Sequence, residues 1–142
     1  MRMKILSIDP GGTTGIAIRM SYITGVNTGD VYTCVLKSPE EVFNMIATGQ
    51  PEVIICENFQ AQTISKYGLH TVRIVGGTYA LAHIYKKRYV LHMPQDRYPF
   101  LSEAKEILEK RRLTLRQPYM EHEKDALAHL LRFEHDESKQ KS

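Results

Sequence analysis

Two acidic residues each stand at the end of a short apolar segment. Asp9 ends one in Ile8-Asp9-Pro10-Gly11-Gly12, and Glu57 ends another in Ile54-Ile55-Cys56-Glu57-Asn58. An acid at the end of a buried strand is costly to bury without a partner, and two such acids brought together repel each other. A divalent cation removes both penalties. Carboxylate oxygens suit Mg²⁺ or Mn²⁺, so the pair indicates a metal site.

A third acid lies in His122-Glu123-Lys124-Asp125-Ala126. His122 and Asp125 are spaced i, i+3 and therefore share one face of a helix. Asp125 stands beside an alanine on the expected inward side, whereas Glu123 is expected to point away. We interpret Glu121 and Glu123 as ordinary first-turn acids, which the helix dipole favours. Together the three acids predict a metal site built from two strand ends and one helix.

The segments around these acids predict the elements that position them. Strands are expected at Met3–Asp9, from Ile16, at Asp30–Lys37, at Val53–Glu57 and at Tyr89–Met93. Helices are expected after the capping residue Ser38, then at His70–Lys87, Ser102–Arg111 and Glu121–Glu134. This order predicts an α/β fold, a five-stranded mixed sheet with helices on both faces. If the fourth strand is parallel to the first, Asp9 and Glu57 emerge at the same sheet edge.

Length and composition indicate one globular domain. The 142 residues are 42% hydrophobic and 25% charged, which suffices for a single core. We expect this domain to span 1–134 and the polar tail 135–142 to be disordered. The longest apolar run is too short for a bilayer, so no membrane partner is expected. Without a signal-peptide pattern, and with Cys34 and Cys56 interpreted as reduced buried thiols, we expect the protein to be cytoplasmic.

Basic residues gather in Lys86-Lys87-Arg88 and Lys110-Arg111-Arg112, and the net charge is +3. Either cluster alone is better interpreted as a solvated helix end. The clusters become better candidates for nucleic-acid contacts because an acidic metal site needs basic residues nearby to bring a polyanion to it. Phosphate contacts are expected from the following residues: Lys66, Arg73, Lys105, Arg111 and Arg112.

Two further features allow two interpretations each. Phe59, two residues after Glu57, either stacks on a nucleic-acid base or is a core aromatic near a strand end. Gly76-Gly77 interrupts a long helix, where each glycine costs about 1 kcal/mol relative to alanine. The pair indicates either close approach of another backbone or ligand, or close packing inside the domain.

The chain resembles the RuvC family of Holliday junction resolvases, within the RNase H-like superfamily. The matching motifs are Ile8-Asp9-Pro10-Gly11 with Thr14-Gly15, Cys56-Glu57-Asn58-Phe59, Gly76-Gly77-Thr78-Tyr79-Ala80-Leu81 and His122-Glu123-Lys124-Asp125-Ala126. The resemblance spans Met3 to about Leu131. The segment from Gln95 to Arg116 departs from the bacterial members and is more similar to diverged, phage-type members.

This resemblance implies an RNase H-like nuclease domain that forms a homodimer, each subunit cutting one strand of a four-way junction. It implies a site for two Mg²⁺ ions, or Mn²⁺ as a substitute, made from Asp9, Glu57, His122 and Asp125. Asp9 would be shared by both ions, and His122 would ligate an ion or assist a water. The expected activity is structure-selective cutting of four-way and other branched DNA in recombination and repair. The cut ends would be 5′-phosphate and 3′-hydroxyl.

Other functions fit parts of the sequence. An RNase H-like nuclease acting on RNA or RNA–DNA hybrids would use a similar third acid. An actin-like or sugar-kinase-type ATPase would use a first phosphate loop that Asp9-Pro10-Gly11-Gly12-Thr13-Thr14 resembles. That fold needs two such domains, and 142 residues supply one. A catalytically silent DNA-binding relative is disfavoured because all three acids are present.

Overall fold

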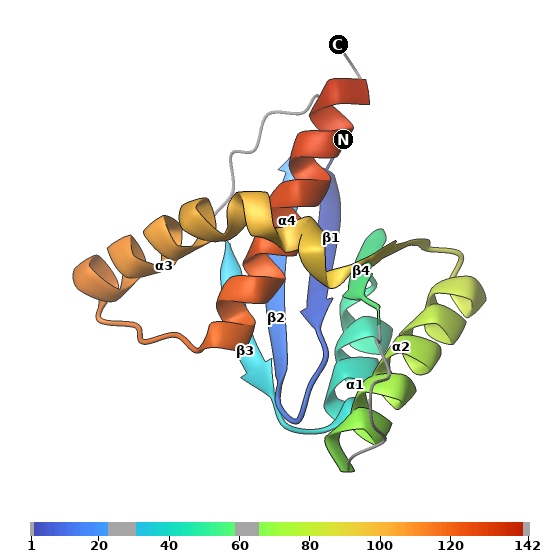
Figure 1. Ribbon diagram of the computed structural model, residues 1–142. Coiled ribbons are helices and arrows are strands. Elements are labelled where there is room, and N and C mark those ends of the chain that lie inside the picture. Colours follow the sequence, from blue (N-terminus) through green and yellow to red (C-terminus); the bar gives the residue numbers. More distant parts are fainter. Residues whose placement is uncertain (1, 23–30, 59–65, 141–142) are drawn as a thin grey trace.

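The computed structural model describes residues 2–22, 31–58 and 66–140 and contains a five-stranded sheet in the order β3-β2-β1-β4-β5 (Figure 1). The strands are β1 (Arg2–Asp9), β2 (Thr14–Tyr22), β3 (Tyr32–Leu36), β4 (Val53–Glu57) and β5 (Arg88–His92). The helices are α1 (Pro39–Gly49), α2 (Lys66–Ile84), the 3₁₀ helix η1 (Pro94–Phe100), α3 (Leu101–Leu115) and α4 (Glu121–Gln140).

The expected mixed sheet is confirmed. Strand β2 pairs antiparallel with both β1 and β3, whereas β4 is parallel to both β1 and β5. Helix α1 lies between β3 and β4 in the chain and provides the crossover that a parallel pair requires. The first and fourth strands are therefore parallel neighbours, as the order of elements predicted.

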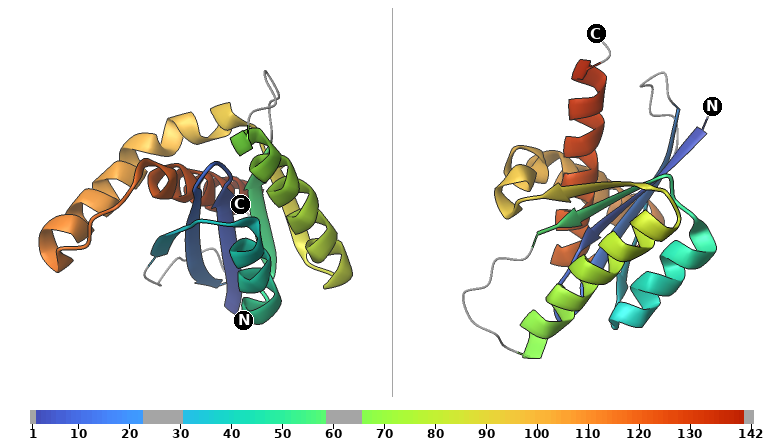
Figure 2. Two further views of the ribbon diagram at one scale, coloured as in Figure 1. Left: turned by 90° about the horizontal axis from the view of Figure 1, so that it is seen from below. Right: turned by 90° about the vertical axis from the view of Figure 1, so that its right-hand side faces the viewer.

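Helices cover both faces of the sheet (Figure 2). Alternate residues of β1 point to opposite faces, so Ile5 packs with α3 and α4, whereas Leu6 and Ile8 pack with α1 and α2. Helix α4 is buried on most sides from Ala126 to Leu131, because it lies between the sheet on one side and α3 and η1 on the other. Within the described residues, no helix is both long and apolar enough to cross a membrane.

The two glycines of α2, Gly76 and Gly77, lie in different environments. A Cβ added at Gly77 would lie 2.3 Å from the ring of Phe43 on α1, so this glycine lets the two helices pack closely. A Cβ added at Gly76 would meet no described heavy atom within 4 Å. Packing inside the domain therefore explains Gly77, whereas Gly76 lies on the outer side of α2.

Several predicted boundaries are wrong. The last helix continues to Gln140 instead of ending near Glu134, because side chains of its final turns find partners. Arg132 pairs with Asp136 at i, i+4, and Glu137 accepts a hydrogen bond from Arg88 of β5 at 2.7 Å. The polar segment that was expected to be disordered is thus helical through residue 140.

The 3₁₀ helix η1 was not predicted at all. Pro94 was interpreted only as the end of the preceding strand, but it occupies the first turn of η1. A carboxylate oxygen of Asp96 accepts a hydrogen bond from the backbone N–H of Met93 at 2.7 Å and so fixes the start of this turn. The turn brings Arg97 toward the strand ends, with consequences for the acidic site.

Candidate metal centre

The two strand-end acids lie together, as predicted. In the parallel pair of β1 and β4, Ile8 is in register with Cys56, so the next residues, Asp9 and Glu57, emerge side by side. Both carboxylates are nearly buried, with exposed fractions of 5% for Asp9 and 8% for Glu57. The proximity of Glu57 contributes to raising the pKa of the Asp9 carboxyl group.

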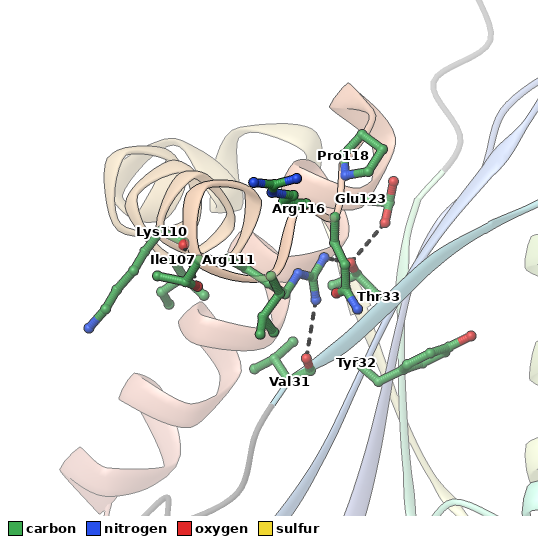
Figure 3. Close-up of a pocket in the computed structure, with 12 residues that line it drawn as sticks. Val31, Tyr32, Thr33, Ile107, Lys110, Arg111, Arg116, Pro118 and Glu123 are labelled. Atoms are coloured by element: carbon green, nitrogen blue, oxygen red, sulfur yellow. Dashed lines mark hydrogen bonds between the residues drawn. The ribbon is translucent and has the colours of Figure 1, made fainter.

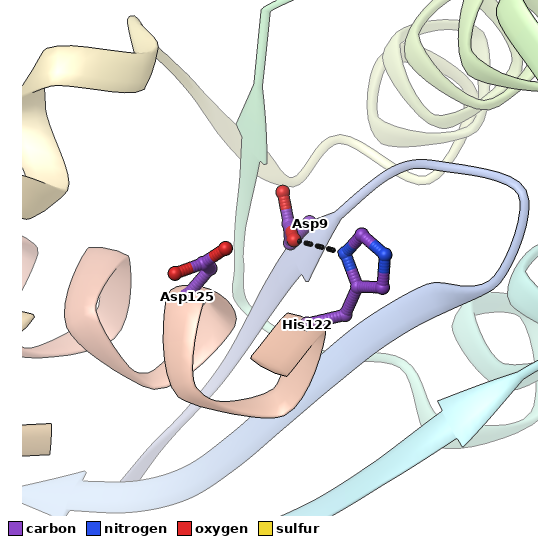
Figure 4. Close-up of side chains that lie close together, drawn as sticks. All are labelled: Asp9, His122 and Asp125. Atoms are coloured by element: carbon purple, nitrogen blue, oxygen red, sulfur yellow. Dashed lines mark hydrogen bonds and ion pairs between the residues drawn. The ribbon is translucent and has the colours of Figure 1, made fainter. Parts of the chain in front are cut away.

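Helix α4 brings His122 and Asp125 to the same edge. The hydroxyl of Ser7 on β1 donates a hydrogen bond to the carbonyl of Ala126 at 2.7 Å and so anchors the helix beside the strand. His122 Nδ1 lies 2.8 Å from Oδ2 of Asp9, and Asp125 projects from the next turn (Figure 4). Possible ligand atoms of Asp9, His122 and Asp125 all lie within 4.8 Å of one another.

Glu57 is held by two residues that the sequence analysis did not identify. Its Oε1 accepts a hydrogen bond from Arg97 of η1 at 2.5 Å, and its Oε2 lies 3.5 Å from Nε2 of His129 on α4. The same Arg97 guanidinium lies 3.6 Å from Oδ1 of Asp125. Arg97 therefore bridges two of the three acids and places a positive charge where the carboxylates converge.

Burial and mutual repulsion perturb the protonation of these acids. Burial raises the pKa of Asp9 to about 7, helped by Glu57 and opposed by the hydrogen bond with His122. Burial also raises the pKa of Asp125. For Glu57, burial is outweighed by its interactions with the facing ring of His129 and with Asp9 and by the positive charge of Arg97, so its pKa falls to about 2. The hydrogen bond with Asp9 raises the pKa of His122.

These residues fit a divalent cation. Three carboxylates and one imidazole supply hard oxygen ligands with one nitrogen, a set that suits Mg²⁺ or Mn²⁺. Without such a cation, Asp9 retains a proton near neutral pH and Arg97 neutralises its neighbours. Both observations are those expected of an acidic site that needs positive charge.

We expect metal affinity to depend on pH through Asp9. A metal binds the ionised carboxylate of Asp9 and the neutral ring of His122, whose pKa is also raised, so the apparent affinity for Mn²⁺ should fall at least tenfold for each pH unit below the pKa of Asp9, about 7. Calorimetric titration between about pH 5.5 and 8.5 measures this dependence. An affinity that is flat across this range would contradict the role of Asp9.

The folding stability of the metal-free protein should decrease as the pH rises, whereas its metal affinity should increase. The folded pKa of Asp9, about 7, exceeds its ordinary value of 3.8, so burying the protonated form favours folding below pH 3.8. This contribution is lost as the pH rises through 7. Added Mn²⁺ should therefore raise the melting temperature more above neutral pH than below it.

Glu123 does not point away from the protein, so that interpretation was wrong. Its side chain is buried, with an exposed fraction of 6%. One oxygen accepts a hydrogen bond from the backbone N–H of Met120 at 2.7 Å, and the other accepts one from the hydroxyl of Thr33 at 2.8 Å. Arg111 donates to the same hydroxyl and to the carbonyl of Val31 (Figure 3). This network fixes the first turn of α4, which carries His122 and Asp125.

The Glu123 network lies on the wall of a pocket of about 740 Å³ between β3 and the end of α3 (Figure 3). Apolar side chains of Val31, Ile107 and Leu115 line it together with the cations Lys110 and Arg116. Arg111 belongs to this wall and uses its guanidinium for contacts within the protein. Arg111 therefore supports the structure of this wall, and its predicted phosphate contact stays a prediction.

Replacing Glu123 by alanine should destabilise the protein. The change leaves a backbone N–H at a helix start and a buried hydroxyl without their acceptor, at a cost of about 1–3 kcal/mol. Glu123→Gln keeps an acceptor oxygen and should cost less. Urea unfolding of the two variants measures the difference. Equal stability of Glu123→Ala and the unmodified protein would show that the network does not hold the helix start.

The remaining candidate DNA contacts have different surroundings. Lys105 is exposed on α3, Arg112 pairs with Glu109, and Arg73 pairs with Glu40 on α1. Phe59 and the side chain of Lys66 lie outside the described residues, so their predictions stay untested.

Comparison with known proteins finds a common fold at low sequence identity. No family model and no curated protein sequence matches the chain. Among solved structures, Thermus thermophilus RuvC in complex with a Holliday junction substrate matches with a TM-score of 0.66 and 17% identity, over 99% of this chain and 97% of that one. The yeast mitochondrial Holliday junction resolvase Ydc2 matches with a TM-score of 0.67 and 13% identity, over 96% of this chain and 80% of that one. The fowlpox virus resolvase in complex with Holliday junction DNA matches with a TM-score of 0.64 and 16% identity, over 93% of this chain and 99% of that one. The RNase H-like fold implied by the sequence resemblance is thereby confirmed.

Proposed function

We propose that this chain is a divalent-metal-dependent endonuclease that cuts four-way DNA junctions and other branched DNA. The observation that carries the proposal is the convergence of Asp9, Glu57, His122 and Asp125 at one sheet edge. This site stands on the fold of three Holliday junction resolvases, two of them solved with junction DNA. The nuclease domain is proposed to act in recombination and repair, in the cytoplasm.

The proposed chemistry is hydrolysis of a phosphodiester bond. Two bound Mg²⁺ ions, or Mn²⁺ in their place, would activate the attacking water and stabilise the leaving 3′ oxygen. Asp9 interacts with Glu57 on one side and with His122 on the other, which suits a ligand shared by both ions. Glu57 and Asp125 would each complete one side, and we assign His122 to ligation. In-line attack opposite the 3′ oxygen leaves 5′-phosphate and 3′-hydroxyl ends.

Arg97 would assist from within the site. Its planar guanidinium already lies against Glu57 and Asp125, and such a group binds phosphate oxygens in a bidentate manner. Lys105 and Arg112 are proposed to contact the backbone farther from the cut.

A substrate panel tests the proposal. Four-way junction, flap, linear duplex and RNA–DNA hybrid, each end-labelled and matched in sequence, are incubated with the protein and Mg²⁺. We expect the junction to be cut fastest and the linear duplex slowest. Preferential cutting of the hybrid would favour the RNA-directed nuclease instead, and no cutting of any substrate would contradict the proposal.

The active form is proposed to be a homodimer joined through α2. This helix exposes Leu69, Val72 and Tyr79 to 55%, 47% and 61%, and with Gly76 they follow a 3–4–3 spacing along one side. The open space at Gly76 permits close approach of a second backbone. Symmetric cutting of a junction requires two sites related by a two-fold axis, which such an interface provides.

Val72→Glu should therefore separate the subunits, because it places a charge in the apolar stripe. Light scattering should show a dimer for the unmodified protein at micromolar concentration and a monomer for the variant. The variant should nick junctions without making paired cuts. A monomeric unmodified protein, even with junction DNA present, would count against this interface.

A further inference from the structure

Behind the metal centre lies a buried pair of histidines that the proposed chemistry does not use. His129 of α4 is completely buried, and His92 at the end of β5 is 7% exposed. Their Nδ1 atoms lie 2.9 Å apart, a hydrogen-bond distance. Buried polar groups of this kind are normally hydrogen-bonded.

The other nitrogen of His129 faces the metal centre. Its Nε2 lies 3.5 Å from Oε2 of Glu57 and has no hydrogen-bond partner among the described residues. The opposite oxygen of the same carboxylate is held by Arg97 at 2.5 Å. Glu57 is therefore contacted from two sides. The guanidinium of Arg97 lies against its Oε1, and the imidazole of His129 faces its Oε2.

The contacts favour a hydrogen on Nε2 of His129. If Nε2 of His129 lacked a hydrogen, its lone pair would face a carboxylate oxygen at 3.5 Å, which is repulsive. With a hydrogen on Nε2, His129 donates toward Glu57. One of the two Nδ1 atoms donates a hydrogen bond to the other, and in either direction this bond fixes the orientation of the His129 ring. Histidines that support a metal site are commonly oriented by a hydrogen bond on their second nitrogen.

We propose that His129, oriented by His92, is a positioning residue that holds the carboxylate of Glu57 for the metal by donating from Nε2. The inference rests on the proposed function for the identity of the site but concerns metal binding, not the cut itself. If Glu57 served as a metal ligand, the hydrogen bond from His129 to its Oε2 would keep the carboxylate from rotating. Partners of this kind change metal affinity about 10- to 100-fold when removed.

Two substitutions at His129 distinguish the effect of losing the hydrogen-bond donor from the effect of changing the packing. His129→Gln places an amide N–H near the position of Nε2 and retains the donor, whereas His129→Leu fills similar space without one. We expect Mn²⁺ affinity, measured by calorimetry without DNA, to fall about 10- to 100-fold in His129→Leu and to stay within about threefold in His129→Gln. Ile46→Ala, a core change on α1 at the opposite face of the sheet, controls for lost stability and should keep its Mn²⁺ affinity while folded.

The unmodified protein offers a second readout that needs no variant to fold. Long-range ¹H–¹⁵N NMR of the metal-free protein reports which ring nitrogens of His129 carry hydrogen. We expect Nε2 to be protonated. An unprotonated Nε2, equal Mn²⁺ affinity in His129→Leu and the unmodified protein, or an equal loss in both His129 variants would each overturn the inference. A protein that binds Mn²⁺ with this dependence but cuts no junction would contradict the proposed function alone.

Discussion

Asp9→Asn and Asp125→Asn should each lower the rate of junction cutting about a thousandfold, equivalent to several kcal/mol of transition-state stabilisation. Each substitution removes a charged ligand but keeps the shape of the side chain. Both residues line the same cluster with His122, so either change should remove a metal site. Glu57→Gln is expected to have a similar effect, because Glu57 supports the other side of Asp9. Single-turnover cutting with saturating Mg²⁺ measures the rates.

The binding of junction DNA distinguishes this explanation from misfolding. The three variants should bind a four-way junction in Ca²⁺ with nearly unchanged affinity, because phosphate contacts come mostly from basic residues elsewhere. Their melting temperatures should stay close to that of the unmodified protein. Near-normal cutting by Asp125→Asn would show that α4 contributes no essential ligand.

Gly15→Ala should reduce cutting about a hundredfold or more, although residue 15 carries no reactive group. A Cβ added at Gly15 of β2 would lie 1.9 Å from the carbonyl oxygen of His122 and 2.9 Å from the backbone nitrogen of Glu123. Both atoms belong to the helix backbone and cannot move alone, so the first turn of α4 must shift. Displacing His122 and Asp125 by about 1 Å is enough to disturb catalytic geometry to this degree.

Gly77→Ala is the matched control. Its Cβ would meet the Phe43 ring at 2.3 Å, on the opposite face of the sheet from the acids. This variant should also lose stability, but its folded fraction should cut at nearly the normal rate. A comparable loss of cutting in both variants would mean that general destabilisation, and not the position of α4, accounts for the effect of Gly15→Ala.

The sequence predicted the parts of this site that depend on the order of elements. The parallel placement of β1 and β4 followed from the crossover helix, and that placement alone brings Asp9 beside Glu57. The i, i+3 spacing on the last helix similarly predicted that His122 and Asp125 share a face. Local periodicity is a strong signal for such features.

The sequence did not predict contacts that form only when distant segments pack. Arg97 reaches Glu57 because an unpredicted 3₁₀ turn redirects the chain after β5. Glu123 closes a hydrogen-bonded helix start on Met120, which lacks the side-chain acceptor that would have marked a cap in the sequence. One usable signal was overlooked: His129 lies at i+4 from Asp125 and i+7 from His122, on the same helix face.

The most direct test of metal-dependent junction cutting is to map the cuts and ask whether ligase can seal them. The unmodified protein is incubated with Mg²⁺ and a four-way junction labelled on each strand in turn, and the products are treated with DNA ligase. We predict nicks at symmetric positions in two strands of like polarity, with 5′-phosphate and 3′-hydroxyl ends that ligase seals, and no nicks when Mg²⁺ is chelated. Cuts that persist without divalent metal, or scattered cuts that ligase cannot seal, would contradict the account.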